Sequence, residues 1–288
     1  MTDVVLTKKM SDGTLLSVTY LPERGMNMTS YKKGDTEVID QSTRPLFEER
    51  SAGLGAMIGP HFHRRRYEIL PAVLRDSSSP FFDKEKKTDP FSHGVGRYAS
   101  WTYERGDDFI RAILKGSDTL HNFPLKELEG RDFTMKYAAD LTEEGLKIRL
   151  SVVSDTDSLV GIHHYYRCDP SRSKVFSRVK ETYIAEEKKL LIPEEIGFDP
   201  ATRELVFDLH QEADFTFRPF PDPTRGVILL DAGDYRLKTE FFCDNEECSW
   251  QLWHPKGAGF VCIEPISSQN PRRPNLTVST IGINLQIL

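Results

Sequence analysis

Four short stretches of the sequence place titratable side chains beside apolar residues, and these stretches carry the residues that could do chemistry. They are 59–66 (GPHFHRRR), 91–101 (FSHGVGRYASW), 161–167 (GIHHYYR) and 259–265 (GFVCIEP). Histidine and carboxylate side chains exchange protons in general acid/base catalysis, whereas arginine only donates hydrogen bonds and charge. The four stretches therefore indicate acid/base chemistry on a polar ligand.

Glu264 is the most informative single residue of the chain. It directly follows the apolar run Phe260-Val261-Cys262-Ile263, where an unpaired buried carboxylate is costly. Glu264 must therefore reach solvent, a cation or a ligand.

Two adjacent histidines lie in the third stretch. If 161–167 is a strand, His163 and Tyr165 share one face, and His164 and Tyr166 share the other. One histidine of the pair should therefore point inward among aromatic rings, and the alternation alone leaves open which one.

Taken in order, the stretches resemble the aldose 1-epimerase (galactose mutarotase-like) family, including its hexose-phosphate mutarotase branch. The resemblance is carried by Gly59-Pro60 with Arg64, His93-Gly94 followed by Trp101, Gly161-Ile162-His163 with Tyr165-Tyr166, Asp214-Phe215-Thr216-Phe217, and Val261-Cys262-Ile263-Glu264-Pro265. It spans roughly residues 59–265. No single motif is specific, so the order and spacing of all five carry the resemblance.

The resemblance implies a large β-sandwich that binds an aldose in an open groove and interconverts its C1 anomers. By the same resemblance, His163 is the general acid and Glu264 the general base. Arg64, His93 and Asp214 then hold the sugar hydroxyls and the ring oxygen.

Anomer interconversion needs one acid and one base. A proton is given to the ring oxygen while another is taken from the C1 hydroxyl, and after rotation about C1–C2 the same pair works in reverse. We expect the two groups on opposite sides of the anomeric centre, and neither a metal nor an organic cofactor is required. Trp101, Tyr165 or Trp253 can stack on a sugar face.

The sequence departs from the family pattern at two positions. The family commonly has proline after the motif histidine, where this chain has His164, so either His163 or His164 can face the groove. The motif and the alternation favour His163.

The family commonly has asparagine before the arginine, where this chain has His63 before Arg64. An arginine cluster facing the groove would bind a phosphate in bidentate fashion, so sugar phosphates stay among the candidate substrates.

Two other classes of protein compete with the enzyme. Gly55, His61, His63 and Glu68 resemble the first half of the cupin signature, a metal-binding β-barrel motif with suitable ligand types. Arg75 stands where that signature has glycine, and three adjacent arginines would repel a metal cation. The second alternative is a carbohydrate-binding protein on the same sandwich that does no chemistry.

Composition narrows the partners. The 288 residues include 38 Lys+Arg and 44 Asp+Glu, a formal net charge of −6, which disfavours nucleic acid and anionic membranes as partners. No segment approaches the roughly 18 apolar residues of a membrane span, and the first residues lack an apolar signal core. We therefore expect a cytoplasmic protein with free thiols at its four cysteines, and the resemblance implies that its partner is a small sugar.

Period-two alternation predicts antiparallel strands over 133–137, 146–152, 205–209 and 235–241, with 141–145 closing the first two into a hairpin. We expect one all-β domain over residues 1–288, a large antiparallel sandwich with few short helices. Residues 177–192 are the most helix-like by propensity and predict one or two helical turns. Residues 76–89 predict a long surface loop.

Overall fold

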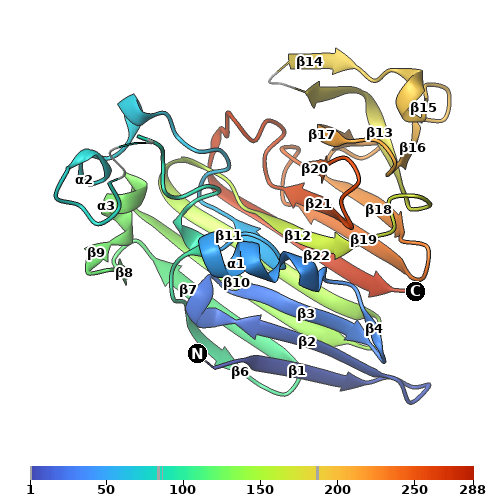
Figure 1. Ribbon diagram of the computed structural model, residues 1–288, viewed down its shortest axis with the longest axis horizontal. Coiled ribbons are helices and arrows are strands. Elements are labelled where there is room, and N and C mark those ends of the chain that lie inside the picture. Colours follow the sequence, from blue (N-terminus) through green and yellow to red (C-terminus); the bar gives the residue numbers. More distant parts are fainter. Residues whose placement is uncertain (1, 83–84, 86, 186–187) are drawn as a thin grey trace.

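The computed structural model describes residues 2–82, 85, 87–185 and 188–288, and within them the paired strands are antiparallel. Figure 1 shows α2, α3, β8 and β9 at one end of the molecule and β14 and β15 at the other. Strands dominate the described chain, because its apolar residues recur at every second position rather than at helical spacing.

The first sheet contains the N-terminal strands and those that carry the third and fourth stretches. Its order is β1 (Val4–Lys9), β2 (Leu15–Leu21), β3 (Asn27–Lys33), β5 (Gly55–Ile58), β12 (Gly161–Arg167), β21 (Phe260–Ile266), β20 (Ser249–His254), β17 (Ala213–Pro219), β13 (Lys174–Ala185) and β14 (Lys188–Leu191), with β4 (Thr36–Glu37) paired to β3. The third and fourth stretches thus become neighbouring strands, although about a hundred residues separate them in the chain.

The second sheet contains most of the remaining strands. Its order is β6 (Thr102–Arg105), β7 (Phe109–Lys115), β10 (Phe133–Thr142), β11 (Gly145–Ser158), β22 (Leu276–Ile287), β19 (Arg236–Cys243), β18 (Arg225–Asp231), β13, β16 (Glu204–Asp208) and β15 (Phe198–Asp199). A separate hairpin joins β8 (Thr119–Leu120) to β9 (Phe123–Pro124). Strand β13 belongs to both sheets, because its first half pairs with β16 and β18 and its second half with β17.

The helices of the described chain are short. They are α1 (Arg44–Arg50), α2 (Ala72–Arg75) and α3 (Leu125–Glu129), with single turns of 3₁₀ helix at η1 (Pro22–Arg24), η2 (Gln41–Thr43), η3 (Tyr67–Ile69), η4 (Val95–Arg97) and η5 (Glu194–Ile196). No helix of the described residues is both long enough and apolar enough to cross a membrane.

The core lies where the inner faces of the two sheets meet. The Tyr20 ring of β2 packs edge-on against the Tyr137 ring of β10, and the two hydroxyls are 3.2 Å apart. Tyr31 of β3 reaches across to donate a hydrogen bond to the carbonyl oxygen of Leu285 in β22. The sandwich predicted from the alternation is therefore confirmed, including the hairpin of β10 and β11.

One predicted element is wrong. Residues 177–192 form the strands β13 and β14 rather than helical turns, apart from 186–187, which lie outside the described residues. Val175, Ser177 and Val179 are buried in alternation along β13, and pairing on both sides satisfies its backbone. Tertiary pairing outweighs the helix propensity of the polar residues here.

The predicted loop at 76–89 contains no helix or strand among its described residues, and positions 83, 84 and 86 lie outside the description. Its last residue departs from a surface loop, because Asp89 is fully buried. This end of the loop is anchored in the protein.

Candidate active site

The floor of the candidate site is one face of β12, β21, β20 and β17. The antiparallel register places His163 opposite Glu264, pairs Glu264 with Gln251 and pairs Gln251 with Thr216. Because alternate residues of a strand share a face, these four side chains form one row across the four strands.

A second row lies beside the first, two positions away from it on each strand. It consists of Tyr165, Cys262, Trp253 and Asp214, which are also paired directly across the sheet. The Tyr165 ring stacks on His163 with a centroid distance of 5.0 Å and an interplanar angle of 12°. The aromatic row therefore fixes the orientation of the histidine.

Two loops form the wall above this floor. The loop after β5 contributes Phe62, His63 and Arg64, and the loop around η4 contributes His93 and Arg97, among others. Floor and loops enclose a cavity of about 270 Å³, which is lined by Arg50, Ala52, Phe62, His63, Arg64, Ser92, His93, Arg97, Tyr98, His163, Tyr165, Asp214, Gln251, Trp253 and Glu264.

His163 and Glu264 form a buried acid/base pair. His163 Nε2 lies 3.4 Å from Glu264 Oε1, and the side chains are 8% and 1% exposed. Burial lowers the pKa of His163 well below its ordinary value, and Arg97 adds to the effect. Burial raises the pKa of Glu264 well above its ordinary value, although Arg97 opposes this. Both groups therefore favour their uncharged forms, and the pair holds a single proton.

Several buried polar atoms at the cavity have no hydrogen-bond partner among the described residues. They are His93 Nδ1, His163 Nδ1 and Glu264 Oε2. The His93 and His163 rings meet edge-on with centroids 5.0 Å apart. Buried polar groups are costly when unsatisfied, so the site is suited to a ligand that brings several hydroxyl groups.

Arg97 is a cation at the cavity that the sequence analysis missed. It is 3% exposed, and its Nε and Nη2 donate hydrogen bonds of 3.0 and 2.8 Å to the Met57 carbonyl oxygen in β5. It belongs to the second stretch, but its approach to Glu264 depends on the packing of η4 against β5. Local sequence carries no signal of that packing.

Asp214 is oriented by a chain of amide and hydroxyl groups. Thr216 Oγ1 donates to Gln251 Oε1, and Gln251 Nε2 donates to Asp214 Oδ1. Partial burial raises the pKa of Asp214, against the effects of Gln251 and Arg272. Gln251 was also missed, since an amide in the middle of a strand has no distinctive spacing.

The structure brings six of the seven predicted site residues to one cavity. They are Arg64, His93, His163, Tyr165, Asp214 and Glu264. His163 is the histidine that faces the cavity, while His164 points to the other face, where its Nδ1 lies 3.1 Å from the Tyr166 hydroxyl.

Trp101 does not join the other six. Its side chain is buried, and its indole Nε1 donates a 2.9 Å hydrogen bond to the Gly96 carbonyl oxygen. This contact holds η4, and so Trp101 supports the segment that carries Arg97. His163 and Glu264 lie side by side on the neighbouring strands β12 and β21, with Nε2 and Oε1 3.4 Å apart.

The residues of the cupin alternative do not converge. Both ring nitrogens of His61 are occupied, Nδ1 by Glu129 and Nε2 by the Phe91 carbonyl oxygen, whereas His63 lines the cavity. The fold is a sandwich rather than a cupin barrel, so this alternative is wrong.

A candidate set of metal donors overlaps the acid/base pair. Ligand atoms of His163, Cys262 and Glu264 lie within 4.8 Å of one another. The Arg97 guanidinium acts on both Cys262 and Glu264 and would repel a cation placed between them. The position of Arg97 therefore disfavours a metal ion at this set. All four cysteines are free thiols, as predicted.

Comparison with solved structures defines the class of fold as galactose mutarotase-like, which confirms the fold predicted from the sequence. No family model and no curated protein matches the sequence. A galactose mutarotase-like protein from Clostridium acetobutylicum aligns with a TM-score of 0.68 at 13% identity, covering 99% of this chain and 98% of its own.

Two further solved structures are similar. A putative aldose 1-epimerase from Escherichia coli K12 has a TM-score of 0.67 at 14% identity, with both chains covered completely. The Slr1438 protein from Synechocystis sp. PCC 6803 has a TM-score of 0.64 at 19% identity, covering 98% of this chain and 95% of its own. At these identities the likeness establishes the shared fold.

The two wall loops pack closely against each other at Gly94, so a side chain at this position should destabilise the protein. This residue has φ +83°, and a Cβ there would lie 2.1 Å from the Gly59 carbonyl oxygen, whereas Gly13 has φ +86° and open space around it. We expect Gly13→Ala to cost about 1 kcal/mol of unfolding free energy for the left-handed backbone. Gly94→Ala should cost more than about 3 kcal/mol, because backbone must also move. Urea denaturation of both variants measures the difference, and equal losses would contradict the packing of the loops.

Proposed function

We propose that this protein is an aldose 1-epimerase-like isomerase that interconverts the α and β anomers of a hexose or hexose phosphate. The observation that carries the proposal is the buried His163 and Glu264 pair, 3.4 Å apart, in a cavity with unsatisfied polar atoms. The mutarotase-like fold supports it, as do the names of the solved structures that share the fold.

The side-by-side arrangement of the pair suits the reaction. The ring oxygen and the C1 hydroxyl oxygen are bonded to the same carbon, so an acid and a base on neighbouring strands can reach both at once. His163 gives a proton to the ring oxygen while Glu264 takes one from the C1 hydroxyl, and the ring opens to the aldehyde. After rotation about C1–C2, Glu264 returns its proton to the aldehyde oxygen and His163 takes one from the ring hydroxyl.

A single proton on the pair serves both directions of this reaction. Ring opening begins with the proton on His163 and ends with it on Glu264, and ring closure runs the reverse. Because burial disfavours the charges of both groups, the resting pair favours the uncharged arrangement, with the proton on Glu264. Passage of that proton to His163 across the 3.4 Å gap prepares the pair for ring opening.

The remaining polar side chains bind the sugar. Asp214 accepts hydrogen bonds from hydroxyls, and His93 and Arg97 contribute donors beside the acid/base pair. Arg64 and Arg50 line the same cavity and would bind a phosphate group through charge-assisted hydrogen bonds.

The activity is tested by optical rotation. Freshly dissolved α-glucose, α-galactose and α-glucose 6-phosphate should reach equilibrium faster with wild-type protein. His163→Ala and Glu264→Gln should each lower the rate by about 10²- to 10⁴-fold, as expected for loss of a general acid or base. His210→Ala, which changes an exposed histidine, is the control. No acceleration on any of the sugars would contradict the enzyme, and sugar binding without acceleration would favour the carbohydrate-binding alternative.

The pH dependence follows from the directions of the two pKa shifts. The pair gains a second proton only when His163 is protonated, and its lowered pKa puts that event below pH 6.5. The pair loses its last proton only when Glu264 ionises, and its raised pKa delays that loss well above pH 4.5. We therefore expect kcat/KM to stay flat across about pH 6.5, where an ordinary histidine titrates. A fall in kcat/KM centred on the ordinary histidine pKa would contradict a buried pair.

The raised pKa of Glu264 predicts that removing its carboxyl group stabilises the folded protein. The pKa of Glu264 is higher in the folded than in the unfolded state, so its ionisation favours unfolding above pH 4.5. Glu264→Gln keeps the shape without this cost, and we expect it to raise the unfolding free energy at pH 7 by about 1 kcal/mol, a gain typical of functional sites. The gain should shrink as the pH falls toward 4.5. Urea denaturation at pH 4.5 and 7 checks this, and a less stable variant at pH 7 would contradict it.

A further inference from the structure

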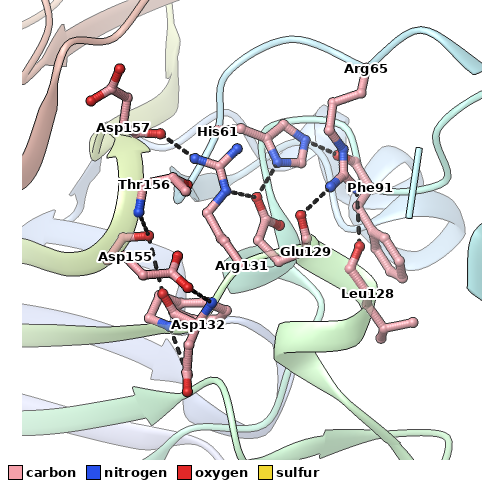
Figure 2. Close-up of polar contacts among 12 residues, drawn as sticks. His61, Arg65, Phe91, Leu128, Glu129, Arg131, Asp132, Asp155, Thr156 and Asp157 are labelled. Carbon is pink, nitrogen blue, oxygen red and sulfur yellow. Dashed lines mark hydrogen bonds and ion pairs between the residues drawn. The ribbon is translucent and has the colours of Figure 1, made fainter. Parts of the chain in front are cut away.

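A group of buried charged side chains lies at the end of α3, and Figure 2 shows His61, Arg65, Glu129 and Arg131 of this group. We call it the buried charge cluster, and it consists of His61, Arg65, Asp89, Glu129 and Arg131. Asp89 and Glu129 are 0% and 2% exposed, and His61 is 7% exposed. The cluster joins the loop after β5 and the loop before η4 to the end of α3.

Arg65 forms one half of the cluster. Its Nε and Nη2 donate to the two carboxylate oxygens of Asp89 at 2.7 and 3.2 Å. The same guanidinium donates to the carbonyl oxygens of Glu129 and Leu128, at the end of α3, at 2.5 and 3.2 Å. Figure 2 shows this side chain reaching α3 from the loop after β5. One arginine therefore connects three segments of the chain.

His61 forms the other half, and its hydrogen bonds reveal its charge. Nε2 lies 2.8 Å from the Phe91 carbonyl oxygen, which only accepts, so Nε2 carries a hydrogen. Nδ1 lies 2.6 Å from Glu129 Oε1. His61, Arg65 and Arg131 lower the pKa of Glu129 despite its burial, so Glu129 is an ionised carboxylate and also accepts. Both ring nitrogens therefore donate, and the ring is an imidazolium paired with an ionised Glu129.

The charged groups around His61 support this assignment. Asp89 Oδ2 lies 3.4 Å from Nε2, Arg131 Nε lies 3.8 Å from the Glu129 oxygen, and Arg65 lies beyond Asp89. Burial alone would lower the pKa of His61, but Glu129 and Asp89 outweigh it and raise the pKa despite Arg65. The nearby His63 is held uncharged by burial, which lowers its pKa to about 4. His93 is likewise uncharged, because burial lowers its pKa.

The anchors flank the residues that line the cavity. His61 and Arg65 bracket residues 62–64, all of which line it, and Asp89 and Phe91 directly precede the lining residues Ser92 and His93. Each wall loop is thus tied to α3 within a few residues of its cavity-facing side chains.

We infer that His61 is a positioning residue of this site, whose doubly hydrogen-bonded imidazolium holds both wall loops against α3. It keeps His63, Arg64 and His93 in place to receive the ligand. The inference rests on the proposed function where it concerns the sugar, and it stands on the cluster alone where it concerns the loops. It also gives a role to the histidine that the cupin pattern did not explain.

The charge of His61 is measured by ¹⁵N NMR of histidine-labelled protein at about pH 7.5, where an ordinary histidine is mostly neutral. We expect a cationic ring, with both nitrogens protonated, whose signals disappear in His61→Asn. A neutral His61 in the wild-type protein would overturn the assignment. This readout is independent of any enzymatic activity.

The positioning role is measured by kinetics on the same sugars. His61→Ala should raise KM by about tenfold or more and change kcat by less than about threefold, because loop placement chiefly affects binding. The matched control is His210→Ala, which removes an exposed histidine that lies 3.2 Å from Asp208. An unchanged KM in His61→Ala would overturn the inference.

A second pair of variants keeps the test valid if His61→Ala fails to fold. The side-chain amide introduced by Glu129→Gln can accept a hydrogen bond from His61 or donate one to its Nδ1, which preserves both hydrogen bonds of the ring, whereas Glu129→Ala can do neither. We expect Glu129→Gln to stay within about threefold of the wild-type KM and Glu129→Ala to match His61→Ala. Equal KM values for the two Glu129 variants would overturn the inference.

Hydrogen exchange separates this inference from the proposed function. Amides of residues 59–65 and 89–98 should lose protection in His61→Ala and Glu129→Ala, and keep it in His210→Ala and Glu129→Gln. If the wild-type protein shows no epimerase activity, this pattern still supports the positioning role. Unchanged protection in all four variants would overturn it.

Discussion

The burial of an ionisable pair on the floor of the sandwich is the constraint on which the rest of the site depends. Glu264 follows an apolar strand and is 1% exposed beside His163, and a charged carboxylate at such a position costs several kcal/mol unless it is compensated. The protein avoids this cost because His163 and Glu264 share a single proton and both favour their uncharged forms. Arg97 lies close enough to add to the lowering of the His163 pKa by burial and to oppose the raising of the Glu264 pKa by burial, and Gln251 is paired with Glu264 across the sheet.

A buried acid/base pair can exchange a proton with a ligand only if its geometry is fixed. The two sheets fix that geometry. The register across β12, β21, β20 and β17 sets the separation of the floor residues through backbone hydrogen bonds rather than through flexible loops. Strand β13 ties this sheet to the other one, and the rings of Tyr20 and Tyr137 meet in the core between them. The loops contribute side chains that line the cavity, and they are held by Arg97 bonded to β5 and by the buried charge cluster.

The sequence predicted those parts of the site that depend on local pattern. Alternation in 161–167 placed His163 and Tyr165 on one face, and the structure has them stacked there. Glu264 could be identified from the sequence alone, because a carboxylate directly after an apolar strand is costly to bury. Arg97, Gln251 and the role of Trp101 could not be predicted in this way, because each depends on which distant segment packs against it. The strand β13 could not be predicted for the same reason. Its local sequence favours a helix, and only its pairing with β16, β17 and β18 makes it a strand.

Two histidine–glutamate pairs in this protein have opposite charge states, and their surroundings explain why. His61 and Glu129 are 2.6 Å apart, the second ring nitrogen of His61 donates to a carbonyl oxygen, and Asp89, Arg65 and Arg131 surround them. Glu129 Oε2 has no hydrogen-bond partner within the part of the chain that the structure describes, but three cationic side chains, His61, Arg65 and Arg131, stabilise the ionised carboxylate. The ion pair is therefore stable and serves structure. His163 and Glu264 are 3.4 Å apart, and His163 Nδ1 and Glu264 Oε2 have no partner among the described residues. Charge there is disfavoured until a ligand supplies hydrogen bonds. In the proposed mechanism, this shortage of partners is what lets the proton move between the two groups.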